Sequence, residues 1–215
     1  MEKNKISTKR TKIIFLANPN NPTGTMVGSL SIQSFLKSVR SDILVILDSA
    51  YAEYVDNKNY SDGVKFVHKF KNVVMLRTFS KLHALASLRL GWAYCPIEIA
   101  NILKSVRAPF SVNSLASYAG IAALEDKKFQ EQSIAHNIKY REWIFDKLKR
   151  YQIDFIPSET NFFLLNFKSE QLASGALQYL EKNKIFVRGM QPYNLNSFLR
   201  ITIGTETEMQ KFLDC

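Results

Sequence analysis

One short stretch of the chain places a lysine and an arginine where they could serve a phosphorylated carbonyl compound. The stretch RTFSKLHALASLRLG (residues 77–91) carries Lys81 among small hydroxyl residues, and Arg89 follows eight positions later. Thr78 and Ser80 supply hydroxyl donors, and the planar guanidinium of Arg89 can grip a phosphate. A lysine beside a fixed guanidinium has its charged form disfavoured, which suits an amine nucleophile. The alternative is a surface lysine in a serine-rich turn.

Two further motifs carry side chains that could hold the rest of such a compound. ILVILDSAY (residues 43–51) closes an apolar run with Asp48, a carboxylate that is costly to bury without a cation or a donor, and Tyr51 follows it. NPNNPTG (residues 18–24) is rich in turn-forming residues and would hold the Asn21 amide rigidly. The alternatives are an aspartate that caps the next helix and a tight loop before a helix.

These motifs lie at the ends of apolar runs that are typical of parallel strands. The runs at residues 12–17, 43–48 and 72–77 are continuously apolar, which predicts strands covered by helices on both faces. Residues 29–41 have one apolar helical face, so the first two strands and this helix form a crossover unit. In such α/β sheets functional groups gather at the carboxyl ends of the strands, where all three motifs lie.

The remainder of the chain predicts longer helices and then a smaller α+β domain. The expected elements are a strand at 90–95, helices at 96–106, 113–125 and 129–151, strands at 160–167, 184–188 and 198–204, and a helix at 170–183. No Gly/Ser linker is present, so the long helix is the expected connector. The predicted organisation is a partial large domain (residues 1–125), a connecting helix (126–150) and a small C-terminal domain (151–215).

Composition indicates which partners the chain could bind and in which compartment it would lie. The chain has 215 residues, 46% of them hydrophobic, and a formal net charge of +10. The basic residues are scattered, which favours a lysine-rich solvated surface over nucleic-acid binding. Cys95 and Cys215 form neither a disulfide framework nor a metal-binding spacing. No run approaches about 18 apolar residues and the first residues lack a signal-peptide core, so we expect a cytoplasmic protein without a membrane span.

Taken in order, the motifs resemble histidinol-phosphate aminotransferases, in the class II branch of the fold-type-I pyridoxal-phosphate aminotransferases. The segments that carry the resemblance are NPNNPTG, DSAY, TFSK, LRLG, FSVNSLA, PSETNFFL, FVRGM and LRITIGT. The resemblance implies an α/β fold with a mainly parallel large-domain sheet, incomplete in this chain, with helices on both faces, and a small C-terminal α+β domain. It also implies a homodimer.

The resemblance implies a cofactor site built on Lys81. Lys81 would form a Schiff base with pyridoxal phosphate and shuttle a proton, and Asp48 would keep the pyridine nitrogen protonated so that the ring accepts electrons. Two side chains would hydrogen-bond the phenolate oxygen, namely Asn21 and Tyr51. Three would hold the phosphate, namely Thr78, Ser80 and Arg89.

The implied substrates are histidinol phosphate and 2-oxoglutarate, which would exchange amino and keto groups by a ping-pong route in histidine biosynthesis. Arg200 would receive the acidic group of the substrate, and Arg188 and Asn161 would line the same pocket. The alternative for Arg200 is a surface arginine at a strand end. Related enzymes act on aromatic amino acids or threonine phosphate, and the residues do not separate these substrates.

The chain departs from the family pattern chiefly at its beginning. Family members start well before NPNNPTG, with an N-terminal arm, a Gly-rich phosphate turn and an aromatic residue that stacks on the cofactor. About the first two fifths of the family's length are expected to be missing, which would leave apolar faces and a sheet edge uncovered. Ser49 and Ser87 also stand where the family usually has Glu and Gly.

Two hypotheses therefore stay open for the function. In one, the chain is an aminotransferase, or the C-terminal part of one, whose N-terminal piece is either supplied by another polypeptide or missing from this sequence. In the other, it is a truncated, non-catalytic relative or a partner-binding fragment.

Overall fold

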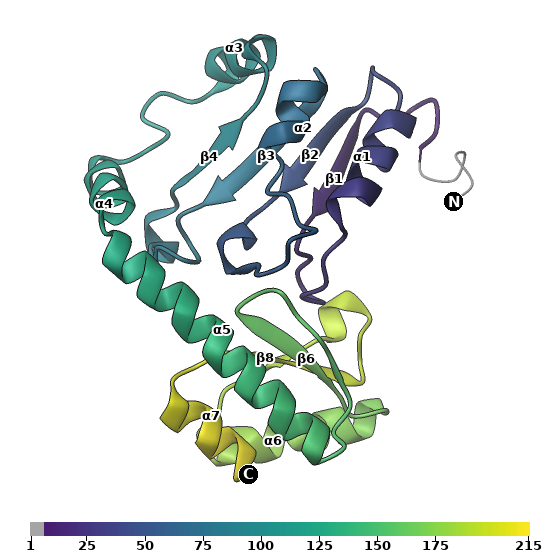
Figure 1. Ribbon diagram of the computed structural model, residues 1–215, viewed down its shortest axis with the longest axis vertical. Coiled ribbons are helices and arrows are strands. Elements are labelled where there is room, and N and C mark those ends of the chain that lie inside the picture. The colour runs from purple at the N-terminus through teal and green to yellow at the C-terminus, as the bar shows by residue number, and fades with distance from the viewer. Residues whose placement is uncertain (1–6) are drawn as a thin grey trace. The chain divides into compact units, whose positions relative to one another are not determined.

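The structure is a computed structural model that describes residues 7–215, and the chain divides into two compact units (Figure 1). Unit 1 comprises the described residues up to Pro19, Val27–Ala52 and Asn57–Gln130. Unit 2 comprises Asn20–Met26, Glu53–Asp56 and Glu131–Cys215. The division at residue 130 leaves most of the long helix inside unit 2, and two short segments of the first half of the chain also group with unit 2. Among the described residues, no helix is long and apolar enough to cross a membrane.

Unit 1 is built on a four-stranded sheet in the order β1-β2-β3-β4. Its strands are β1 (Ile13–Ala17), β2 (Leu44–Asp48), β3 (Val73–Thr78) and β4 (Gly91–Tyr94). The first three strands are parallel and β4 is antiparallel to β3. The register aligns Ala17, Asp48 and Leu76, so the carboxyl ends of the parallel strands meet at one edge of the sheet, here called the carboxyl edge. The helices are α1 (Ser29–Ser38), α2 (Val64–Lys69), α3 (Ile97–Val106) and α4 (Ser114–Glu125).

The core of unit 1 lies on one face of this sheet. Ile32 and Leu36 of α1 and Phe66 of α2 pack in one buried cluster with strand residues such as Val45 and Met75. The expected crossover of β1, α1 and β2 is confirmed, as is the α/β class. The apolar spacing of α1 explains this arrangement, because residues four apart share one face of a helix.

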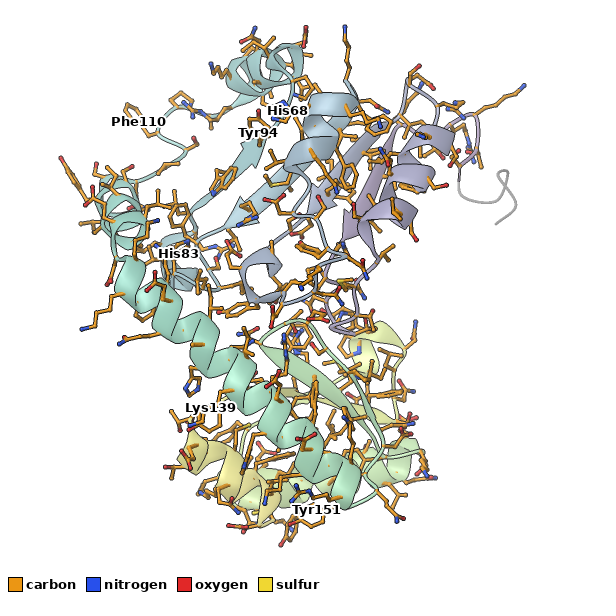
Figure 2. All side chains as sticks on the ribbon, viewed as in Figure 1. His68, His83, Tyr94, Phe110, Lys139 and Tyr151 are labelled. Atoms are coloured by element: carbon orange, nitrogen blue, oxygen red, sulfur yellow. The ribbon has the colours of Figure 1, made fainter. Side chains whose placement is uncertain are left out.

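The expectation that the strands are covered on both faces is wrong for β1. Phe15, which is in register with Ile46, is 70% exposed, and Ile13 is half exposed. Within the described residues β1 pairs only with β2, so a continuously apolar strand at the edge leaves apolar side chains in solvent. Strand β4 is likewise exposed, and Phe110, between α3 and α4, is 98% exposed (Figure 2). Unit 1 thus leaves large apolar side chains of its edge strand β1, of β4 and of the loop at Phe110 exposed to solvent.

Unit 2 carries an antiparallel sheet in the order β5-β6-β8-β7. Its strands are β5 (Phe155–Ile156), β6 (Phe162–Asn166), β7 (Arg188–Gly189) and β8 (Phe198–Thr202), and its helices are α5 (Lys127–Arg150), α6 (Glu170–Lys182) and α7 (Glu206–Leu213). Phe163 and Leu199 of the sheet pack against Ile144 and Leu148 of α5 in its core. The strand expected at 184–188 forms only at 188–189, and the short elements α2, β5 and α7 were not expected from the sequence.

Candidate functional site

At the carboxyl edge of the sheet in unit 1, a carboxylate and a phenol lie where β2 ends, and an amine lies in the turn after the neighbouring strand β3. Asp48 is the last residue of β2, and its Oδ1 accepts a hydrogen bond of 3.1 Å from the backbone N–H of Ala50. Tyr51 is buried, and the Nζ of Lys81 lies 5.1 Å from the centroid of its ring. An aromatic face attracts a cation at this distance, so Tyr51 holds the lysine amine beside its ring.

The residues predicted to bind phosphate surround the same lysine along the chain. Thr78 ends β3, and its Oγ1 accepts the backbone N–H of Ser80 at 3.0 Å, which closes a tight turn directly before Lys81. Arg89 has a positive φ of 54° and is exposed, and its NH1 donates to the carbonyl of Ala86 at 2.7 Å. A guanidinium carries five N–H donors, so this bond leaves others for an anion.

The two positions that depart from the family pattern are accommodated locally. Ser49 is buried, and its hydroxyl donates to the carbonyl of Asp62 at 2.7 Å. Ser87 is exposed within a single turn of 3₁₀ helix at Ala86–Leu88. His83 lies two residues beyond Lys81, stacks on Phe79 with ring centroids 4.9 Å apart, and has a buried Nδ1 with no hydrogen-bond partner among the described residues (Figure 2). The sequence offered only a lone histidine at this position, which indicated no role.

The residues predicted to bind substrate gather in unit 2, and Asn21 gathers with them. The NH1 of Arg200 donates to the Oδ1 of Asn21 at 2.6 Å, and its guanidinium lies over the Phe162 ring at 4.6 Å. Asn161 directly precedes Phe162 at the start of β6, and its carbonyl accepts the N–H of Ile203. The cofactor ligands expected from the sequence therefore fall in both units, with Asn21 in unit 2 and the other members of the set in unit 1.

Two arginines face one another across neighbouring strands of unit 2. The register pairs Arg188 of β7 directly with Arg200 of β8. Directly opposed residues project from the same face of a sheet, and like charges in that position are unfavourable. Arg188 is exposed, with its guanidinium 5.8 Å from the Tyr193 ring. Two cationic side chains on one face of the sheet are suited to binding an anion.

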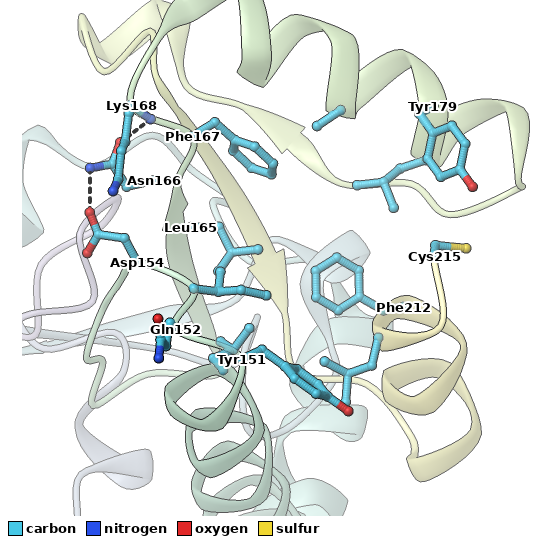
Figure 3. Close-up of a pocket in the computed structure, with 15 residues that line it drawn as sticks. Tyr151, Gln152, Asp154, Leu165, Asn166, Phe167, Lys168, Tyr179, Phe212 and Cys215 are labelled. Carbon is cyan, nitrogen blue, oxygen red and sulfur yellow. Dashed lines mark hydrogen bonds between the residues drawn. The ribbon is translucent and has the colours of Figure 1, made fainter.

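A separate cavity of about 460 Å³ in unit 2 contains none of the predicted residues (Figure 3). Its lining is mostly apolar and includes Leu148, Leu165 and Phe212, with Tyr151 and Cys215 also in its wall. Its polar contacts join Asn166 to Asp154 at 2.8 Å and to the backbone of Lys168 at 2.9 Å. In the described part of the chain no cluster of His, Cys, Asp and Glu is arranged to hold a metal ion. The candidate residues therefore form two separate groups, one at the carboxyl edge of unit 1 and one around the arginine pair of unit 2.

Known proteins are similar to this chain in both sequence and fold. The family model for aminotransferase class I and II matches residues 1–215. A histidinol-phosphate aminotransferase of Granulibacter bethesdensis is 47% identical over 201 residues, which are 94% of this chain and 54% of that protein. One from Paramagnetospirillum magneticum is 44% identical over 205 residues, 94% of this chain and 56% of that protein. The chain thus spans about half the length of the curated relatives that it matches.

A solved structure shows the same architecture. The histidinol-phosphate aminotransferase of Sinorhizobium meliloti, determined in complex with pyridoxal-5'-phosphate, aligns with a TM-score of 0.85 at 26% identity, over 94% of this chain and 56% of its own. The match to the family model over the full sequence, together with these relatives, identifies the family. This chain belongs to the class I and II aminotransferases.

Proposed function

We propose that this chain carries the lysine-bearing part of a pyridoxal-phosphate-dependent aminotransferase that exchanges the amino group of histidinol phosphate with the keto group of 2-oxoglutarate. The observation that carries the proposal is the position of Lys81. Its amine lies over the buried Tyr51 ring at the carboxyl edge of the sheet, where Asp48 ends β2. The relatives named above support the choice of substrate.

The side chains of unit 1 fit the chemistry of this cofactor. When bound, pyridoxal phosphate supplies an electron sink for the carbanion formed at the substrate carbon. The Asp48 carboxylate would accept the pyridine N–H and hold the proton there, and the Tyr51 hydroxyl would donate to the ring oxygen. The hydroxyls of Thr78 and Ser80 and the remaining donors of Arg89 would bind the phosphate. Lys81 would bind the aldehyde carbon and then move the proton at the substrate carbon.

The side chains of unit 2 fit an anionic substrate. Arg200 is oriented by Asn21 and by the Phe162 ring, and Arg188 stands opposite it in the sheet. Histidinol phosphate and 2-oxoglutarate both carry an acidic group, and a planar guanidinium binds either a phosphate or a carboxylate through paired hydrogen bonds. We assign Arg200 as the principal anion ligand, with Arg188 and Asn161 beside it.

The same proposal includes a partner polypeptide for this chain. The exposed apolar residues of β1, Ile13 and Phe15, support contact with a further polypeptide, either in a homodimer or in a separate N-terminal half. A cytoplasmic location and the absence of nucleic-acid and membrane binding stay predictions from the sequence. The predicted domain boundaries of this chain, at residues 1–125, 126–150 and 151–215, likewise stay a prediction.

An absorption titration with pyridoxal phosphate tests the proposed function. The wild-type chain should develop a visible absorption band, since the amine of Lys81 bonds to the aldehyde, and Lys81→Ala should not. The matched control is Lys71→Ala, which removes an exposed lysine that precedes β3 and should keep the band. If wild type and Lys81→Ala give the same spectrum, the chain does not bind the cofactor through this lysine, and the non-catalytic hypothesis takes its place.

A further inference from the structure

A buried arginine lies on α5 at a point where the proposed function gives it no role. The side chain of Arg141 is only 8% exposed. Its NH1 donates to the carbonyl of Tyr54 at 3.2 Å, and its NH2 lies 3.5 Å from the Oε2 of Glu159. Burial lowers the pKa of Arg141 from its ordinary value, and the Glu159 carboxylate opposes this shift. A buried charge carries a large desolvation cost, so its partners must compensate for it.

The same face of α5 makes a second buried polar contact one turn earlier. The amide of Asn137, four residues before Arg141, donates to the carbonyl of Thr160 at 3.2 Å. Residues four apart on a helix lie one above the other. Asn137 therefore holds Thr160, and Arg141 holds Glu159, in the turn that leads into β6.

That turn is in contact with residues 20–24 of the NPNNPTG motif, which belong to unit 2. The backbone N–H of Glu159 donates to the carbonyl of Gly24 at 2.9 Å, and the N–H of Gly24 donates to the carbonyl of Asn20 at 2.7 Å. A Cβ placed on Gly24 would lie only 2.1 Å from the Oγ of Ser158, so the two backbones approach closely. Residues 20–26 are thereby fixed against the turn that Arg141 and Asn137 hold.

We propose that Arg141 is a positioning residue, which fixes residues 20–26 through Glu159 so that the Asn21 amide meets the guanidinium of Arg200. The assignment rests on the proposed function to the extent that Asn21 and Arg200 bind cofactor and substrate. The planar fork of arginine reaches a carbonyl and a carboxylate together, whereas a lysine presents a single ammonium group. Arg141→Lys should therefore keep part of the positioning of residues 20–26, and Arg141→Met should keep none of it.

Hydrogen–deuterium exchange of the complete chain tests this role without a ligand. In Arg141→Met, the peptides that cover residues 20–26 and 157–161 should exchange faster than in wild type, while those of β6 and β8 keep wild-type rates. Arg141→Lys should be intermediate. The control is Arg150→Met, at the exposed end of the same helix, and should match wild type. Wild-type rates at residues 20–26 in Arg141→Met would overturn the proposal, as would a uniform increase throughout unit 2, which indicates general destabilisation.

Binding of 2-oxoglutarate gives the second readout. Arg200→Met should weaken binding at least about tenfold, because it removes a charged hydrogen-bond donor, and Arg141→Met should weaken it by a smaller factor of about three to ten. Wild-type affinity in Arg141→Met beside a weakened Arg200→Met would contradict the positioning role. If the exchange differences appear but the wild-type chain does not react with pyridoxal phosphate, the positioning role stands and the proposed function fails.

Discussion

Replacing Gly24 with alanine should destabilise unit 2 by about 2–5 kcal/mol. Gly24 has a φ of +74°, and the left-handed region costs an L-residue about 1–2 kcal/mol. The new Cβ would lie 2.1 Å from the Oγ, 2.5 Å from the Cβ and 3.3 Å from the Cα of Ser158. Relieving this overlap needs a backbone shift, and overpacking of this kind costs about 1–3 kcal/mol.

Denaturant unfolding followed by tryptophan fluorescence in a Trp92→Phe background measures this loss, since the remaining Trp143 packs against the core of unit 2. Ser158→Gly removes the two closest contacts, so Gly24→Ala should cost about 1–3 kcal/mol less in that background, while the cost of the positive φ remains. The control is Gly175→Ala in α6, where an added Cβ meets nothing within 4 Å. This control should stabilise the helix by about 0.5–1 kcal/mol. Equal unfolding free energies for Gly24→Ala and Gly175→Ala would refute the close approach of residues 20–26 and 158–160.

Three other predictions concern the core, the pH response and the open edge of the sheet. Phe163→Ala should lower the free energy of unfolding by about 3–5 kcal/mol, because Phe163 is fully buried. Phe186→Ala, at a side chain that is 78% exposed, should change it by less than about 0.5 kcal/mol. The backbone N–H of Thr205 holds the pKa of Glu208 below its ordinary value. This stabilisation is complete above the ordinary glutamate pKa of about 4.3 and is lost as the pH falls through the lowered folded-state pKa, so Glu208→Gln should flatten the acid side of the stability profile. Phe15→Glu should reduce self-association in sedimentation at increasing concentration, and an unchanged mass distribution would show that β1 is not an association surface.

Local sequence signals were sufficient where a candidate site residue lies at or just after the end of a buried strand. Five apolar residues before Asp48 and the hydroxyl-rich turn before Lys81 predicted both the strands and the edge at which they end. The structure places Lys81 over Tyr51 there. This local pattern is informative because consecutive residues show both the apolar run of a buried strand and the polar residues at its end.

Contacts between distant residues could not be predicted in this way. The bond between Asn21 and Arg200 joins positions 179 residues apart, and no local pattern indicates that residues 20–26 group with the C-terminal half of the chain. No local pattern distinguishes Arg141 from the other charged residues of its helix, although Arg141 is buried against Glu159. The apolar run of β1 by itself predicted cover on both faces, because such a run does not distinguish an edge strand from a central one. Only the resemblance to the family, whose members start well before NPNNPTG, indicated that apolar faces and a sheet edge would be uncovered.

The most direct test of the central claim is the site of covalent attachment of the cofactor. The chain would be incubated with pyridoxal phosphate, reduced with borohydride, digested and analysed by mass spectrometry. We predict that a single lysine, Lys81, retains the pyridoxyl group, and that Lys81→Arg retains none. Label spread over many of the surface lysines, with no excess at Lys81, would contradict the assignment of this lysine and with it the proposed function.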